Sequence, residues 1–190
     1  MPVPVLAATY GPTVAAGFFL VQRVWALPAS VIGSAVADVF FQRAAAHVCE
    51  PRQPLLHLVL RTAVMLGAIA FLPALTLWIW GGQLFRLIFG ESWEYAGHYA
   101  GLMAPWLFFA FVASPVSRVF ALADRPWPKL LYDFVSLATV IATPVLSKNV
   151  YLLNDKDMIL ILSLFNVVLY ALYFVTILRV SVTIQMKSCV

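Results

Sequence analysis

Residues 158–178 read MILILSLFNVVLYALYFVTIL, an apolar run without a charged side chain. A helix that crosses the hydrocarbon core of a bilayer needs about 20 mostly apolar residues. This run meets that requirement, and it therefore predicts a transmembrane helix.

Four further segments of the chain satisfy the same criterion. They lie at residues 14–41, 62–80, 97–117 and 130–147. The 190-residue chain is 63% hydrophobic and only 11% charged, whereas a soluble domain carries about a quarter charged residues. No run of alternating polarity indicates a barrel. The sequence therefore predicts an all-α polytopic membrane protein with about five transmembrane helices.

The two ends of the chain predict an incomplete assembly. Residues 1–13 are expected to be the stub of a preceding helix followed by an outer loop, and residues 14–190 a C-terminal transmembrane lobe. The stretch GGQLFRLIFGESWEYAG, residues 81–97, is amphipathic and too short to span. It is expected to lie along the outer interface.

Basic residues are distributed unevenly between the predicted loops. One side holds Arg43, Arg52, Arg61, Arg118, Arg125, Lys129, Arg179 and Lys187, and the other holds Arg86, Lys148 and Lys156. Cytoplasmic loops carry the excess of Lys and Arg. The expected orientation therefore has the C-terminus in the cytoplasm and the N-terminus outside.

The first predicted span contains a charge well inside it. Residues 15–46 read AAGFFLVQRVWALPASVIGSAVADVFFQRAAA, with Arg23 among apolar neighbours. In a helix, Ser30 and Ser34 fall within about 20° of the direction of Arg23, and Asp38 about 60° away. Such a face favours a water-filled cavity or a close helix contact. Alternatively, the span begins at Val24 and Arg23 is an anchor at the surface.

Four other polar residues are weaker candidates. Asp38 and Arg118 could belong to a cavity or gate, although Arg118 is also explained as a cytoplasmic anchor after the third span. Asp133 could pair with an arginine in a cavity, or could lie at the interface beside Lys129. Asn166, in the last span, is expected to bridge helices by hydrogen bonds.

The chain lacks the motifs of common enzymes. It has no Ser/His/Asp cluster, no paired carboxylates and no glycine-rich phosphate loop, and its three histidines are far apart. No basic run or aromatic-basic platform indicates nucleic acid. The sequence predicts a protein that is not an enzyme and has no cofactor, no metal site and no nucleic-acid partner.

Two stretches resemble a known family. They are AAGFFLVQRVWALPASVIGSAVADVFFQRAA at 15–45 and LIFGESWEYAGHYAGLMAPWLFFAFVASPVSRVFALADR at 87–125. The internal QR with a following LP, the FG–W–AG–YA turn and the APW…SP-S helix resemble the C-terminal lobe of bacterial oligosaccharide flippases. These are the O-antigen type members of the multidrug/oligosaccharidyl-lipid/polysaccharide exporter superfamily.

The resemblance implies one lobe of a two-lobed transporter in the bacterial cytoplasmic (inner) membrane. Its substrate would be a polyprenyl-pyrophosphate-linked oligosaccharide for cell-surface polysaccharide or lipopolysaccharide synthesis. Its partners would be membrane lipids and an N-terminal lobe, and Arg23 would contact the pyrophosphate. The alternatives are a related multidrug exporter and a non-transporting fragment or scaffold.

Overall fold

In the computed structural model of the chain, residues 3–49, 55–122, 127–149 and 154–188 are described. Within those ranges every element is helical. The elements are α1 (Val3–Tyr10), α2 (Pro12–Cys49), α3 (Leu55–Phe89), the 3-10 turn η1 (Glu91–Trp93), α4 (Glu94–Val116), α5 (Val119–Leu122), α6 (Trp127–Asn149) and α7 (Asp155–Ser188). Within the described ranges, five stretches, containing α2, α3, α4, α6 and α7, are long and apolar enough to cross a membrane. The predicted all-α polytopic membrane protein is confirmed.

The helices are longer than the predicted spans. The span predicted at 62–80 is part of a 35-residue helix, α3, and that predicted at 158–178 is part of the 34-residue α7. At 1.5 Å per residue, a helix of that length measures about 50 Å, whereas the hydrocarbon core is about 30 Å thick. The apolar windows therefore located the spans but not the further turns that extend each helix beyond them.

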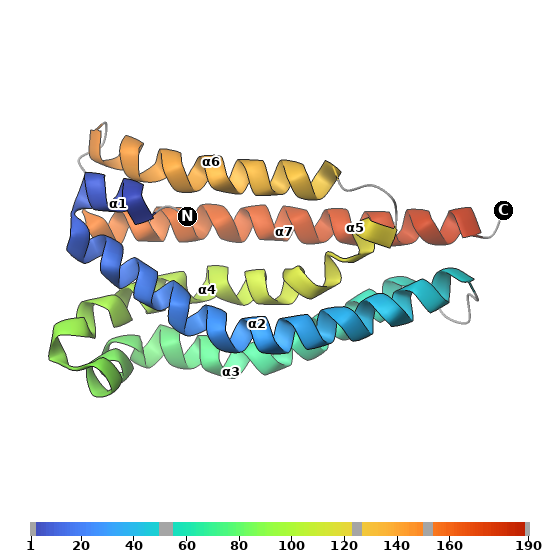
Figure 1. The fold of residues 1–190 in the computed structure, drawn as a ribbon, viewed down its shortest axis with the longest axis horizontal. Coiled ribbons are helices and arrows are strands. Elements are labelled where there is room, and N and C mark those ends of the chain that lie inside the picture. The colour runs from blue at the N-terminus through green and yellow to red at the C-terminus, as the bar shows by residue number, and fades with distance from the viewer. Residues whose placement is uncertain (1–2, 50–54, 123–126, 150–153, 189–190) are drawn as a thin grey trace.

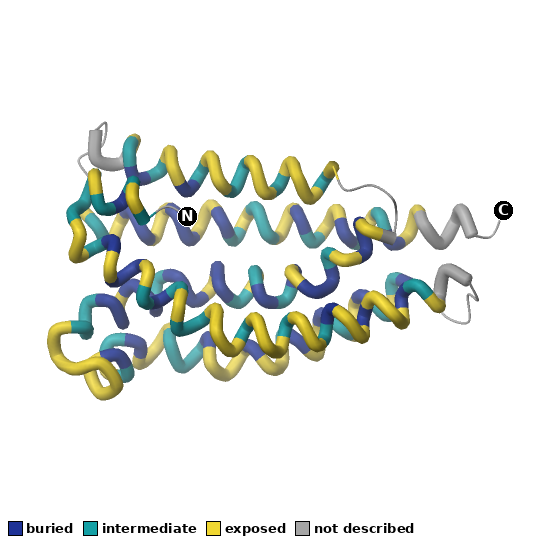
Figure 2. Tube along the Cα trace, viewed as in Figure 1, coloured by how far each residue is buried: buried dark blue, intermediate teal, exposed yellow. Residues whose placement is uncertain are grey.

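Helix α4 occupies the centre of the bundle (Figure 1) and contacts α2, α3 and α7. Much of its length is buried (Figure 2). Its sequence explains this position, because small residues let neighbouring backbones approach closely. The small buried residues of α4 are Ala96, Gly97, Ala100, Gly101, Ala104 and Ala113.

The outer helices present large apolar side chains to their surroundings. On α2, Val31 is 70% exposed, on α3 Leu72 is 70% exposed, and on α6 Phe134 is 69% exposed. In water such surfaces would be a liability. In a bilayer the solvent is itself hydrocarbon, and these side chains are suited to face it.

Successive long helices run in opposite directions (Figure 1), so that helix ends collect at two ends of the bundle. One end, called here the basic end, carries Arg43, Arg61, Arg118, Lys129 and Arg179, and the other, the aromatic end, carries Arg86 and Lys156. The side chains of Arg52, Arg125, Lys148 and Lys187, on which the predicted orientation also rests, lie outside the described residues. The aromatic end takes its name from Trp78, Trp80, Trp93, Tyr95 and Tyr99.

The stretch 81–97 begins at a kink in α3. Trp80 has non-helical dihedral angles (φ −117°, ψ 15°) and joins two helical segments, of which residues 81–89 form the second. Gly90, at φ +95°, then turns the chain into η1 and α4. The position of this stretch along the outer interface stays a prediction.

The outer loop expected within residues 1–13 is reduced to one residue. Residues 3–10 form the short helix α1, which packs against α2 and α6, and α2 begins at Pro12. Between them Gly11 has φ +92°, a left-handed conformation that glycine adopts without steric cost.

Candidate functional site

Arg23 lies inside the apolar span Pro12–Ala46 of α2. At 1.5 Å per residue it is about 16 Å along the helix axis from Pro12. Its side chain is exposed, and it forms no hydrogen bond or ion pair with any other described residue. The structure therefore places a guanidinium group on the exposed face of a helix that is long and apolar enough to span a membrane.

Ser30, Ser34 and Asp38 continue the same face of α2 and are all exposed. We call these three residues and Arg23 the polar stripe. The Ser30 hydroxyl donates to the Leu27 carbonyl at 2.9 Å, and the Ser34 hydroxyl donates to the Val31 carbonyl at 3.2 Å. Since each hydroxyl donates its proton to its own helix, the oxygen still has a lone pair to accept a hydrogen bond.

Near Arg23, the opposite side of α2 packs into the bundle. Phe18 and Val21 are fully buried and belong to the largest apolar core, and Gly17 lies directly against the rings of Tyr95 and Tyr99 on α4. On a helix, residues two and five positions from Arg23 point about 160° and about 140° away from it. The polar stripe therefore begins on the side of α2 that faces away from the core of this bundle.

The structure joins Asp38 to Arg118, two candidates named separately from the sequence. A guanidinium nitrogen of Arg118 lies 3.7 Å from a carboxylate oxygen of Asp38, and both side chains are more than half exposed. Arg118 follows the end of α4 at Val116, and Asp38 lies in the second half of α2. The pair therefore connects the polar stripe to the junction of α4 and α5.

Asp133 is not part of this arrangement. It is exposed on α6 and forms no hydrogen bond or ion pair with the other described residues. In Figure 1, α7 and α4 lie between α6 and most of α2. The structure does not bring Asp133 to Arg23.

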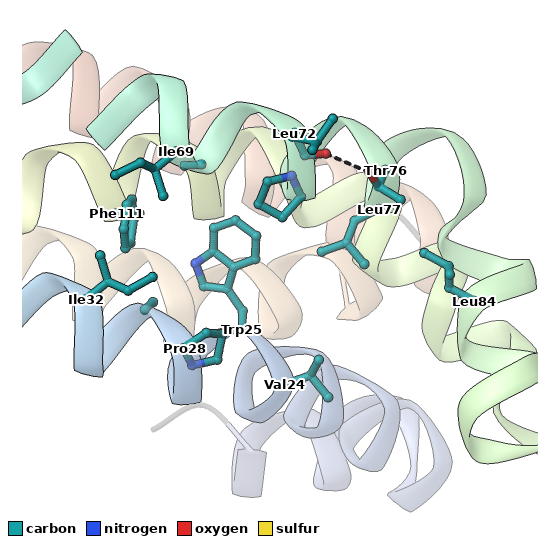
Figure 3. Close-up of a pocket in the computed structure, with 13 residues that line it drawn as sticks. Val24, Trp25, Pro28, Ile32, Ile69, Leu72, Thr76, Leu77, Leu84 and Phe111 are labelled. Atoms are coloured by element: carbon teal, nitrogen blue, oxygen red, sulfur yellow. Dashed lines mark hydrogen bonds between the residues drawn. The ribbon is translucent and has the colours of Figure 1, made fainter. Parts of the chain in front are cut away.

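An apolar groove of about 470 Å³ lies on the opposite side of α2, between α2 and α3 (Figure 3). Trp25 lies in its middle and packs edge-on against Phe111, with ring centroids 6.5 Å apart. The one hydroxyl among its lining side chains belongs to Thr76, which donates to the Leu72 carbonyl at 2.7 Å. The groove therefore offers mostly surface for hydrocarbon, and the indole N–H of Trp25 is the polar donor among its lining side chains that has no acceptor in the described part of the chain.

Sequence reasoning missed this groove, although two prolines inside helices were a signal. Pro28 in α2 and Pro73 in α3 both line it. A proline within a helix removes a backbone hydrogen bond and bends the axis. Figure 1 shows that α2 changes direction part-way along its length, as expected from Pro28.

Asn166 fulfils its predicted role as a contact between helices. It is fully buried in α7, its amide donates to the Leu162 carbonyl at 2.8 Å, and its amide oxygen lies 3.5 Å from the Ser136 hydroxyl of α6. Next to it, the rings of Tyr132 and Tyr173 stack with centroids 4.4 Å apart. These contacts hold α6 against α7.

A second cavity, of about 430 Å³, lies at the aromatic end and was also missed. It combines residues of α3, α4 and α7 and is more polar than the groove. Its polar lining residues are Gln83, Glu94, His98 and Lys156, and its aromatic ones are Trp78 and Trp80. We call it the end pocket.

The residues of the FG–W–AG–YA turn hold helices together. Gly90 makes the left-handed turn. Gly97 crosses α3 so closely that an added Cβ would clash with the backbone of Gly81. The Tyr99 hydroxyl donates to the Asp155 carboxylate of α7. This part of the resemblance thus has a structural explanation in the packing of α3, α4 and α7.

No protein-family model, curated protein or solved structure matches the chain significantly. The flippase family remains a prediction from the quoted motifs. A function for the chain therefore rests on those motifs and on the geometry of the polar stripe, the groove and the end pocket.

Proposed function

We propose that this chain is one lobe of a flippase that moves a polyprenyl-pyrophosphate-linked oligosaccharide across the bacterial cytoplasmic membrane for cell-surface polysaccharide synthesis. The observation that carries the proposal is the polar stripe. Arg23 is exposed, without a partner among the described residues, in a membrane-spanning helix, and it faces away from its own bundle.

A guanidinium group facing lipid is unfavourable. On insertion scales, arginine at the centre of a spanning helix costs about 2.5–3.5 kcal/mol. A second helical unit that encloses water against the polar stripe would remove this cost. In the proposal that unit is the N-terminal lobe of the same transporter, and substrate sites of such paired lobes lie near the midplane between them.

The chemistry of the polar stripe fits a pyrophosphate. Guanidinium donates two parallel hydrogen bonds to phosphate oxygens and keeps its charge at any physiological pH. Ser30 and Ser34 extend a polar surface along the helix from Arg23. Arg23 would hold the headgroup, and the serines would contact the sugar or water beside it.

The excess of basic residues at one end of the bundle supports an orientation of the chain in the membrane. With the basic end in the cytoplasm, the C-terminus is cytoplasmic and the N-terminus is outside. The substrate would then move from the basic end toward the aromatic end.

The placement of carboxylates favours a phosphate substrate over a cationic drug. A cation exporter needs free acidic groups inside the membrane. Asp38 is paired with Arg118, and Asp133 lies away from the polar stripe. The unpaired charge on the stripe is positive.

The test replaces Arg23 in the full-length protein. Arg23→Ala should abolish surface polysaccharide, and Arg23→Lys should restore part of it because it keeps the charge but not the bidentate geometry. Arg61→Ala, at an exposed arginine of α3, is the matched control and should leave export normal. Immunoblotting of membranes for a C-terminal tag checks protein levels, and a band near twice the 21.0 kDa of this chain would support a two-lobed protein.

Normal export by Arg23→Ala would contradict a role for Arg23 in transport. If deletion of the protein also left export unchanged, the chain would be better explained as a non-transporting scaffold or fragment.

A further inference from the structure

The end pocket is built where α3 is broken. Trp80 leaves the helical conformation, and the backbone on both sides of the break lines the cavity. At membrane depth, irregular backbone is tolerated only where it is buried in protein or lines a polar cavity. The polar pocket therefore accounts for how the break in α3 is tolerated.

The pocket has a floor of backbone rather than side chains. Gly81, Gly82, Gly97 and Gly101 all line it, and a Cβ on Gly82 would lie only 3.0 Å from the His98 ring. A Cβ on Gly81, Gly97 or Gly101 would meet the backbone of the facing helix, so these glycines let α3 and α4 cross closely. The cavity of about 430 Å³ lies beside this crossing.

The walls carry one acidic and one basic group from different helices. Glu94 comes from the first turn of α4, and Lys156 from the first turn of α7. Glu94 is 3.9 Å from Arg86, and both of these side chains are about half exposed. Such a long, exposed ion pair is weak, and an ionised carboxylate has oxygen lone pairs for further donors.

The position of the pocket defines the kind of molecule that reaches it. Trp78 and Trp80 are 66% and 51% exposed beside it, and tryptophan is enriched where a membrane meets water. A pocket at this level is reached by the headgroups of the surrounding lipids.

We propose that the end pocket binds the zwitterionic headgroup of phosphatidylethanolamine. The primary ammonium donates to Glu94 and lies against a tryptophan face, where a cation is attracted by the ring. The phosphate accepts from Lys156 and from the amide of Gln83. Neither Glu94 nor Lys156 belongs to the polar stripe, so the inference does not depend on the proposed function.

The probe is a set of three lipids with identical acyl chains and different headgroups: ethanolamine, choline and glycerol. Purified, delipidated full-length chain is incubated with the equimolar mixture, and retained lipid is measured by native mass spectrometry. The ethanolamine lipid should be retained most. The choline headgroup has no N–H to donate to Glu94, and the glycerol headgroup has no cation.

Two variants separate the two contacts. Glu94→Gln should lower retention of the ethanolamine lipid by up to about fivefold, the upper end of the range for a partly exposed ion pair, and leave the glycerol lipid unchanged. Lys156→Gln should lower both, because both carry the phosphate. Lys129→Gln, at an exposed lysine of α6 at the basic end, is the control and should change neither.

Equal retention of the three headgroups by the wild-type chain would overturn the proposal. So would equal loss of all three in Glu94→Gln, or a loss in Lys129→Gln as large as in Lys156→Gln.

Circular dichroism and size-exclusion chromatography verify that each variant is folded. Because Lys156 has no hydrogen bond or ion pair with another described residue, its variant tests the phosphate contact even if Glu94→Gln is misfolded. Arg23→Ala should leave lipid retention unchanged, so failure of this proposal and failure of the flippase proposal are distinguishable.

Discussion

The guanidinium of Arg118 lies 3.7 Å from the carboxylate of Asp38 and links the end of α4 to the second half of α2. Asp38 is the last member of the polar stripe, and Arg118 lies at the basic end of the bundle. The pair therefore closes one end of the face on which Arg23 lies. Any rearrangement that moves α2 away from α4 at this end has to break it.

Breaking this pair should cost little stability. Asp38→Asn and Arg118→Gln should each lower the free energy of unfolding by less than about 1 kcal/mol, because exposed ion pairs at this distance are weak. Thermal unfolding of the purified variants, followed by circular dichroism, measures the change. A double-mutant cycle isolates the coupling energy, and a coupling well above that range would mean that the pair is shielded from water in the assembled protein.

The contact between Gly81 and Gly97 should tolerate an added side chain poorly. Gly97→Ala places a methyl group against the backbone of α3, and overpacking of this kind costs about 1–3 kcal/mol. The matched control is Gly33→Ala in α2, where the nearest atom to the new methyl group is 3.9 Å away.

Gly33→Ala should be neutral or stabilising, because alanine is favoured over glycine in a helix by about 1 kcal/mol. The comparison uses the same thermal unfolding measurement. Equal stability of the two alanine variants would contradict close backbone packing of α3 and α4 as the cause.

Water should reach the polar stripe but not the groove. In the full-length protein, with Cys49 and Cys189 replaced by serine, Ser34→Cys should react with a water-soluble maleimide because the stripe faces a hydrated cavity in the proposed transporter. Ile32→Cys, on the apolar groove, is the control and should react slowly. Mass spectrometry after timed labelling measures both rates, and equally slow labelling would indicate that the stripe faces lipid.

The sequence was sufficient for the spans, because each is a long, mostly apolar run. It was also sufficient for the grouping of Ser30 and Ser34 with Arg23, because α2 is one continuous helix and its periodicity places them on one face. Those inferences need only local information. The helix ends could not be placed, since hydropathy locates the part of a helix inside the bilayer and not the residue at which the helix ends.

Tertiary contacts could not be predicted in this way. Asp38 and Arg118 were each named, but nothing in the sequence indicates that positions so far apart meet. The end pocket depends on where Gly81 and Gly97 cross and on the break at Trp80. Glycines in apolar segments are common, and which pair makes a crossing is decided by the packing of whole helices.

The crossing of Gly81 and Gly97 restricts how the protein can move. Two backbones that touch directly cannot slide past each other without a steric clash. We therefore expect α3 and α4 to move together as one rigid unit. Helix α2 packs against α3 and α4 through other contacts, and it contains a bend of its own. It is therefore freer to change its angle relative to them. If this lobe rocks against a second one, the hinge should therefore lie along α2, and α3 and α4 should carry their walls of the end pocket as one rigid unit, whereas Lys156 moves with α7.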